Sequence, residues 1–229
     1  MISQNRCRTL VLLSGSGSNL QTLIEGQQQG KLPIDICAVI SNRADAFGLV
    51  RATDAGIATE WLDHRAYSSR ENFDRQLLAT IDRYTPELVI LAGFMRVLTR
   101  CFVRHYKGRM LNIHPSLLPK YPGLNTHQRV LDDGERRHGV TVHFVTEKLD
   151  GGPAVIQAVI PILDGDNAGS LKQRIQRQEH RIYPMAVDWF ASGRLSMASD
   201  TVVLLDGETL PANGYPMESA LKHTADALI

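Results

Sequence analysis

The amino-acid sequence predicts an α/β fold: a doubly wound, mostly parallel, Rossmann-like sheet with helices on both faces, an antiparallel edge and a short C-terminal hairpin. Three observations support this prediction. In the first half of the chain, short apolar runs alternate with segments of helical periodicity, which is typical of a parallel sheet covered on both sides. A glycine-rich loop at 15–19 joins the first apolar run to the first helical segment. The apolar runs at 140–144 and 154–161 have no helix between them, so we expect a mixed sheet edge there.

The N-terminal half is expected to alternate strand and helix. In the first predicted helix, Leu20, Leu23 and Ile24 share one face, and Gly30 ends the helix. The strands are expected at 8–13, 36–40, 57–62 and 88–92, and two further helices at 47–55 and 71–84.

The C-terminal half is expected to contain strands, one long helix and a hairpin. Val140, Val142 and Phe144 alternate with Thr141 and His143, a pattern that predicts a strand with one exposed face. The other elements are expected as strands at 110–114 and 154–161, a helix from about 167 to 190, and hairpin strands at 201–205 and 208–210.

Composition and charge narrow the functional classes. The 229 residues are 43% hydrophobic and carry a formal net charge of +1, so we expect neither nucleic-acid nor membrane binding. Three scattered cysteines (Cys7, Cys37 and Cys101) indicate a reducing compartment. With no long apolar run and no signal pattern, a cytoplasmic location is expected. The eight histidines lack metal-ligand spacing, and no metal is expected.

The segment 110–119 carries the strongest chemical signal in the chain. Asn112 and His114 lie two residues apart in an apolar, strand-like run, and alternate residues of a strand project to one face. Pro115 ends the strand and leaves both polar groups at its carboxyl edge. A neutral amide donor beside a titratable imidazole suits the stabilisation of a developing oxyanion and proton transfer to it. Taken alone, Asn-x-His is equally compatible with a structural histidine.

The glycine-rich loop at 15–19 favours a phosphate, because free backbone N–H groups and the helix dipole meet there. A dinucleotide is the competing ligand. Its fingerprint fails because Leu20 replaces the third glycine and because 41–43 offers no acid for a ribose diol. One terminal phosphate is therefore favoured. A tight turn with Ser18 as N-cap and no ligand stays open as the alternative.

Four separated motifs occur in one order along the chain: SGSGSNL at 14–20, LAGFMR at 91–96, NIHPSLLP at 112–119 and LDGGP at 149–153. Together they resemble the folate-dependent formyltransferases, and the similarity runs from about residue 9 to residue 195. KYPG at 120–123 and QEHRIYP at 178–184 resemble the members that act on glycinamide ribonucleotide. Four motifs in this order are highly specific, whereas any one of them alone is not.

The resemblance implies a reaction. A formyl group would pass from 10-formyltetrahydrofolate to the primary amine of 5'-phosphoribosylglycinamide, in de novo purine biosynthesis. The family's catalytic residues match Asn112, His114 and Asp150 of this sequence. The amine would attack the formyl carbon directly, so neither a protein nucleophile nor a metal is required. Asn112 and a protonated His114 would stabilise the charge on the formyl oxygen, and Asp150 would favour the imidazolium.

The resemblance also implies two binding sets. The substrate phosphate and ribose would be held by Gly17, Ser18, Asn19, Gln176, Arg177, Gln178 and Glu179. The folate would be enclosed by Arg70, Met95, Arg96, Val97, Leu98, Asn112, Thr146, Glu147, Lys148, Leu149 and Asp150. One departure is Asn125, which stands where some relatives carry histidine, and this weakens any role of that position in proton transfer.

We expect a single domain over 1–198, with a phosphate-binding half at about 8–107, a folate and catalytic half at about 108–198, and an extension at 199–229. The expected partners are the two small-molecule substrates, and the expected assembly is a monomer or weak homodimer. Rival members that formylate tRNA or hydrolyse formyl-folate carry a further domain for which this chain leaves little room. A binding module without catalysis would be expected to have lost the Asn112, His114 and Asp150 set.

Overall fold

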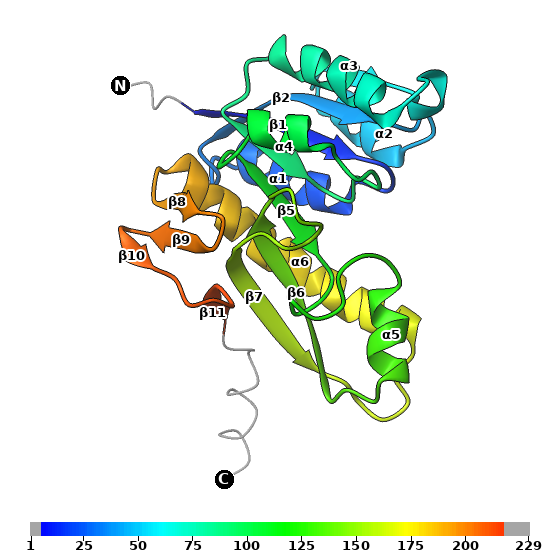
Figure 1. The fold of residues 1–229 in the computed structure, drawn as a ribbon, viewed down its shortest axis with the longest axis vertical. Helices are drawn as coiled ribbons and strands as arrows, with labels where there is room; N and C mark the ends of the chain where they lie inside the picture. Colours follow the sequence, from blue (N-terminus) through cyan, green and yellow to red (C-terminus); the bar gives the residue numbers. More distant parts are fainter. Residues whose placement is uncertain (1–5, 218–229) are drawn as a thin grey trace.

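A computed structural model describes residues 6–217 and arranges them around one eight-stranded sheet (Figure 1). The strand order is β11-β7-β6-β5-β4-β1-β2-β3, and the five N-terminal strands are all parallel. The order reverses between β1 and β4, which is where a doubly wound sheet opens a crevice for ligands. The predicted Rossmann-like sheet is confirmed. Its parallel strands are β1 (Cys7–Leu13), β2 (Ile34–Ser41), β3 (Thr59–Trp61), β4 (Leu88–Leu91) and β5 (Met110–His114).

The predicted antiparallel part of the sheet is also confirmed. β6 (Arg137–Phe144) runs antiparallel to both β5 and β7 (Ala154–Pro161). β11 (Tyr215–Met217), which the sequence pattern does not predict, then adds parallel to β7 and forms the edge. Its three residues are too few to show a periodicity.

The expectation that strand 140–144 has one exposed face is wrong. Thr141 and His143 are both buried. The Thr141 hydroxyl donates to the carbonyl of Ser116 at 2.7 Å and accepts from the amide of Leu118 at 3.1 Å. The segment after β5 therefore covers the face that alternation assigned to solvent, and the polar residues of that face are satisfied by hydrogen bonds within the protein.

Helices cover both faces of the sheet. Alternate residues of β1 show the two layers, because Val11 and Leu13 pack into one apolar core while Leu10 and Leu12 pack into the other. The first core takes side chains from α1 (Ser18–Gln28), α2 (Phe47–Asp54) and α6 (Ala168–Ala191), and the second from α3 (Arg70–Asp82) and α4 (Arg100–His105). The sequence pattern predicts neither α4 nor α5 (Thr126–Asp132), which have six and seven residues and so show fewer than two helical repeats.

The long helix α6 crosses one face of the sheet (Figure 1). Asn167 caps it, and its side chain accepts from the amides of Gly169 and Ser170. Further along, the buried Tyr183 hydroxyl lies 2.9 Å from the carbonyl oxygen of Leu91 and 3.0 Å from that of Leu111. Tyr183 thus ties α6 to the last residue of β4, beside the candidate site, and to the second residue of β5.

The predicted C-terminal hairpin is confirmed inside a three-stranded antiparallel sheet of order β10-β9-β8. Asp206 and Gly207 both have positive φ (53° and 84°), as a two-residue hairpin turn with the twist of its strands requires. Part of the expected extension, residues 218–229, lies outside the described residues. The three strands are β8 (Leu195–Ser199), which was not predicted, β9 (Val202–Leu205) and β10 (Glu208–Thr209).

Candidate active site

β5 brings two polar residues to the carboxyl edge of the sheet. Asn112 and His114 are the third and fifth residues of this strand, and Pro115 follows directly. β5 lies between β4 and β6, so its backbone is hydrogen-bonded on both sides and holds the two side chains in a fixed register. Asn112 and His114 therefore stand two residues apart on one strand, at its carboxyl edge, as the sequence predicts.

His143, on β6, is a member of this cluster that the sequence reasoning missed. It is the register partner of Asn112, and its Nε2 lies 3.1 Å from Asn112 Nδ2. His143 Nδ1 lies 2.9 Å from the carbonyl oxygen of Phe144; a carbonyl only accepts, so Nδ1 carries the proton and Nε2 accepts. Burial lowers the pKa of His143 well below its ordinary value, so the ring is neutral near pH 7. Asn112 thus donates one amide hydrogen to His143 and has a second on the same nitrogen.

The third predicted catalytic residue, Asp150, reaches the cluster on a tight turn. Its φ is 47°, and its Oδ2 accepts from the amide of Gly123 at 2.8 Å. Gly152 makes the turn possible, because a Cβ there would lie 1.8 Å from the carbonyl oxygen of Phe144 at the end of β6. The second glycine of the Asp-Gly-Gly sequence is therefore required by the close approach of this loop to the sheet.

The Asp150 carboxylate faces both histidine rings. Its Oδ2 lies 3.6 Å from His114 Nδ1, and its Oδ1 lies 4.0 Å from His143 Nε2. His114 Nε2 lies 2.9 Å from the carbonyl oxygen of Tyr121 and therefore carries a proton. His114 Nδ1 is then the ring nitrogen that faces the Asp150 carboxylate.

A cavity of about 270 Å³ opens beside this cluster at the carboxyl ends of β1, β4 and β5. Gly17 is the N-cap of α1 with a φ of 68°, and a Cβ on it would lie 2.6 Å from the Cα of Gly48. The cap has no side-chain hydrogen bond, so the first N–H groups of α1 are left to a ligand. The alternative of Ser18 as N-cap is wrong, because Ser18 is the first helical residue.

Two residues of α6 line the same cavity, 158 and 160 positions after their partners at the start of α1. Gln176 Nε2 donates to Ser18 Oγ at 2.9 Å, and Asn19 Nδ2 donates to Glu179 Oε2 at 2.9 Å. The buried Asn19 Oδ1 has no partner among the described residues. Burial raises the pKa of Glu179 above its ordinary value, although the bond from Asn19 opposes this shift.

The remaining residues predicted on this helix lie elsewhere. Arg177 is exposed, and the side chain of Gln178 accepts from Arg181 at 3.1 Å. Neither belongs to the lining of the cavity, because only positions three or four apart share one face of a helix.

A second cavity, of about 140 Å³, is lined by residues of the cluster itself. Asn112 and Asp150 line it together with His143, whereas Ile113 and Pro115 line the first cavity, so the end of β5 separates the two. Its walls include most of the predicted folate residues: Arg96, Val97, Leu98, Thr146, Glu147, Lys148, Leu149 and Asp150. Further apolar walls come from Leu91, Phe94, Val103 and Val145.

Two predicted folate residues are placed differently. Met95 lines the first cavity rather than the second, although its neighbour Arg96 lines the second. Arg70, at the start of α3, lines a third cavity of about 430 Å³ together with Asp74 and Arg100. The buried Arg96 Nε has no partner among the described residues, so this cation offers a donor at the second cavity.

Within residues 6–217, no group of three or more His, Cys, Asp or Glu side chains is arranged to hold a metal ion. No helix in the described part of the chain is long and apolar enough to cross a membrane.

A family model described as formyl transferase matches residues 7–187. The chain belongs to the formyl transferase family. It is 54% identical over 206 residues to phosphoribosylglycinamide formyltransferase of Escherichia coli, covering 90% of this chain and 97% of that protein. It is also 47% identical over 195 residues to the trifunctional purine biosynthetic protein adenosine-3 of Drosophila melanogaster, covering 84% of this chain and 14% of that longer protein.

Solved structures agree with this membership. The phosphoribosylglycinamide formyltransferase of Coxiella burnetii, in complex with CHES, superposes on this formyl transferase with a TM-score of 0.88 at 51% identity. The match covers 93% of this chain and the whole of that one. The resemblance found in the four sequence motifs is thus confirmed for the family and for the fold.

Proposed function

We propose that this formyl transferase moves the formyl group of 10-formyltetrahydrofolate to the primary amine of 5'-phosphoribosylglycinamide, in de novo purine biosynthesis. The observation that carries the proposal is that Asn112 and Asp150, with His114 beside Asp150, line one cavity, while the neighbours of His114 in the chain, Ile113 and Pro115, line another of different chemistry. One cavity offers helix N–H groups and Glu179, and the other offers apolar walls with the Arg96 cation. The similarity to proteins named phosphoribosylglycinamide formyltransferase supports the same substrates.

The phosphate end of the ribonucleotide fits the first cavity. Gly17, Ser18 and Asn19 would bind the phosphate through the N-terminus of α1. Glu179 would accept hydrogen bonds from the ribose hydroxyls, and Gln176 would hold the Ser18 hydroxyl. Burial raises the pKa of the Glu179 carboxyl, because the buried carboxylate has lost hydrogen bonds from water. The hydroxyls of a bound ribose would supply hydrogen-bond donors in their place.

The folate fits the second cavity. The apolar side chains of Leu98, Val103 and Val145 would pack against the pterin, and the loop 146–150 would meet its polar edge. With the pterin in this cavity, the formyl group would lie beside Asn112 and Asp150.

The chemistry needs no covalent intermediate with the protein. The amine nitrogen attacks the formyl carbon, a C–N bond forms, and negative charge develops on the formyl oxygen. The second amide hydrogen of Asn112 and a protonated His114 Nδ1 would stabilise this charge. The bond to the folate N10 then breaks while a proton leaves the amine and one reaches N10. Asp150 holds the imidazolium and orients the proton carrier.

The test is a spectrophotometric assay of the purified protein with 10-formyltetrahydrofolate, with and without the ribonucleotide. We expect deformylated folate only when the ribonucleotide is present, together with an equal amount of formylated product. Release of folate without the ribonucleotide would indicate hydrolysis and contradict the proposal. No reaction in either cuvette would also contradict it.

A cytoplasmic location, the absence of macromolecular partners and a monomeric or weakly dimeric state remain predictions.

A further inference from the structure

Ser14 joins the loops that line the two cavities. It follows β1, and its amide donates to the carbonyl of Gly93 at 3.0 Å. Its hydroxyl accepts from the amide of Met95 at 2.8 Å, so it holds the segment after β4 that contributes to both cavities. The hydroxyl has one hydrogen of its own, and the direction in which that hydrogen points decides whether a lone pair of the oxygen faces the Met95 amide.

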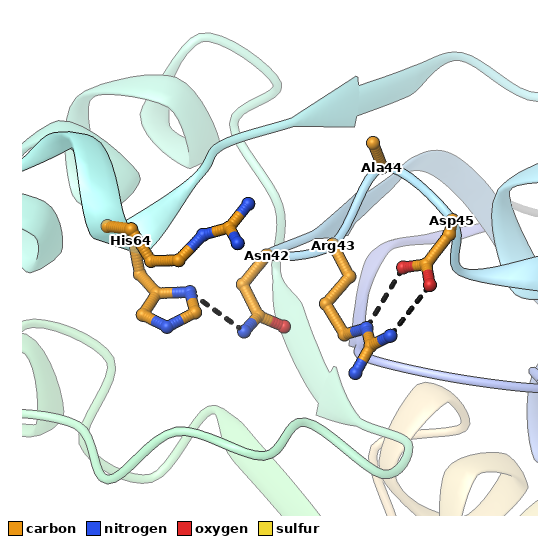
Figure 2. Close-up of a pocket in the computed structure, with 6 residues that line it drawn as sticks. Asn42, Arg43, Ala44, Asp45 and His64 are labelled. Carbon is orange, nitrogen blue, oxygen red and sulfur yellow. Dashed lines mark hydrogen bonds and ion pairs between the residues drawn. The ribbon is translucent and has the colours of Figure 1, made fainter.

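Asn42 takes that hydrogen. Asn42 follows β2 and is buried, and its Oδ1 accepts from Ser14 Oγ at 2.5 Å. On its other side, Asn42 Nδ2 lies 3.3 Å from His64 Nδ1 (Figure 2). Because the amide oxygen already serves Ser14, the nitrogen donates and His64 accepts. The neighbouring Arg43 is bound to Asp45 at 2.9 and 2.6 Å and leaves Asn42 to this chain of hydrogen bonds.

Asn42 lies outside both substrate cavities. It lines a separate cavity of about 360 Å³ with Arg43, Asp45, His64 and Arg65, and it belongs to the lining of neither the first nor the second cavity. Within residues 6–217, the Asn42 side chain reaches the site through its hydrogen bond with the Ser14 hydroxyl. Asn42 is therefore placed to act on the site indirectly.

We propose that Asn42 is a positioning residue that holds the Ser14 hydroxyl on the Met95 amide and so fixes the phosphate loop and the folate loop relative to one another. The inference rests on the proposed function, since it assigns one substrate to each loop. A serine hydroxyl without an acceptor samples its staggered rotamers, and only one of them serves Met95. Loss of Asn42 should then loosen both loops together. This effect acts equally on ground and transition states, so it should appear in KM more than in kcat.

The experiment compares Ser14→Ala, Asn42→Ala and the double variant. Each single change should raise KM for both the ribonucleotide and the formyl-folate by about 3- to 10-fold, the effect of one hydrogen bond, with a smaller change in kcat. The double variant should resemble the single ones, because the two residues act through one contact. An increase in only one KM, or additive effects in the double variant, would overturn the proposal.

Two further measurements separate positioning from loss of stability. Asn167→Ala removes the side-chain oxygen that accepts from the amides of Gly169 and Ser170 at the start of α6, so it should lower the melting temperature and leave both KM values unchanged. Hydrogen exchange at the Met95 amide should accelerate in Ser14→Ala and Asn42→Ala, and this readout needs no activity. If Asn42→Ala does not fold, Asn42→Leu removes the acceptor at similar volume and decides, and unchanged Met95 exchange in that variant sinks the inference. An inactive wild type would instead count against the proposed function.

Discussion

Asn112 Nδ2 and His143 Nε2 are 3.1 Å apart across the antiparallel ladder of β5 and β6. His143 is buried and neutral near pH 7, and its other nitrogen is bound to the carbonyl of Phe144. The ring can therefore only accept from Asn112, which sets the orientation of the carboxamide. An amide that is oriented in advance stabilises a developing charge without reorganising at the moment of reaction.

Replacing His143 should therefore reduce turnover although the proposed mechanism does not place it on the reacting atoms. We expect His143→Ala to lower kcat by about 10- to 100-fold, because the Asn112 amide loses its orientation. His143→Gln keeps an acceptor in this direction and should recover part of the loss. Steady-state kinetics measure kcat for each variant, and the melting temperature of each variant checks that it is folded. Equal kcat values in wild type and His143→Ala would contradict the role.

His114→Ala should lower kcat by about 100- to 10,000-fold, the range for a residue that transfers protons and stabilises charge. The affinity for the ribonucleotide, measured by calorimetry, should change little because the phosphate cavity is built from other residues. A variant with near-wild-type turnover would remove His114 from the mechanism.

Gly17→Val should raise KM for the ribonucleotide far more than KM for the folate. The added side chain would meet the Cα of Gly48 at 2.6 Å and force the loop away from the phosphate. Gly30→Ala is the matched control, since Gly30 has the same φ of 68° and open space around it. It should cost about 1 kcal/mol of stability and leave both KM values unchanged. Equal increases in both KM values for Gly17→Val would argue against a phosphate at this loop.

Glu179 should lower the stability of the fold as pH rises. Its pKa is raised by burial in the folded state, so the unfolded chain releases the proton first. Below the ordinary glutamate pKa there is no penalty; stability then falls as pH rises from that value to the raised one, and the loss is complete above it. Glu179→Gln should be more stable than wild type near neutral pH and equal to it at acid pH. Thermal melts across this range test the sign.

The same Glu179→Gln variant should bind the ribonucleotide more weakly, since an amide is a poorer acceptor for ribose hydroxyls than a carboxylate. Steady-state kinetics on the protein samples used for the thermal melts give the KM for the ribonucleotide, which should be higher in this variant. A variant that gains stability and keeps a wild-type KM would show that the carboxylate does not contact the substrate.

The pattern of neighbouring residues was sufficient to predict a mostly parallel sheet with an antiparallel edge, the glycine-rich loop after β1 and the polar residues at the end of β5. Parallel buried strands are continuous apolar runs, and helices of ten or more residues complete several repeats, so both can be recognised from neighbouring residues. The Asn112 and His114 pair belongs to the same class, because the two-residue period of a strand places both side chains on one face.

Contacts between segments that are distant in the sequence determined which side chains pair in the site and which are buried. Asn19 meets Glu179 across 160 positions, and Ser14 meets Asn42 across 28, and neither pairing leaves a periodic trace in the chain. His143 enters the site because β6 pairs with β5 in one particular register, and it is buried because the loop after β5 covers a face that alternation assigned to solvent. Burial and side-chain pairing depend on what packs on top of an element, and a pattern of neighbouring residues does not contain that information.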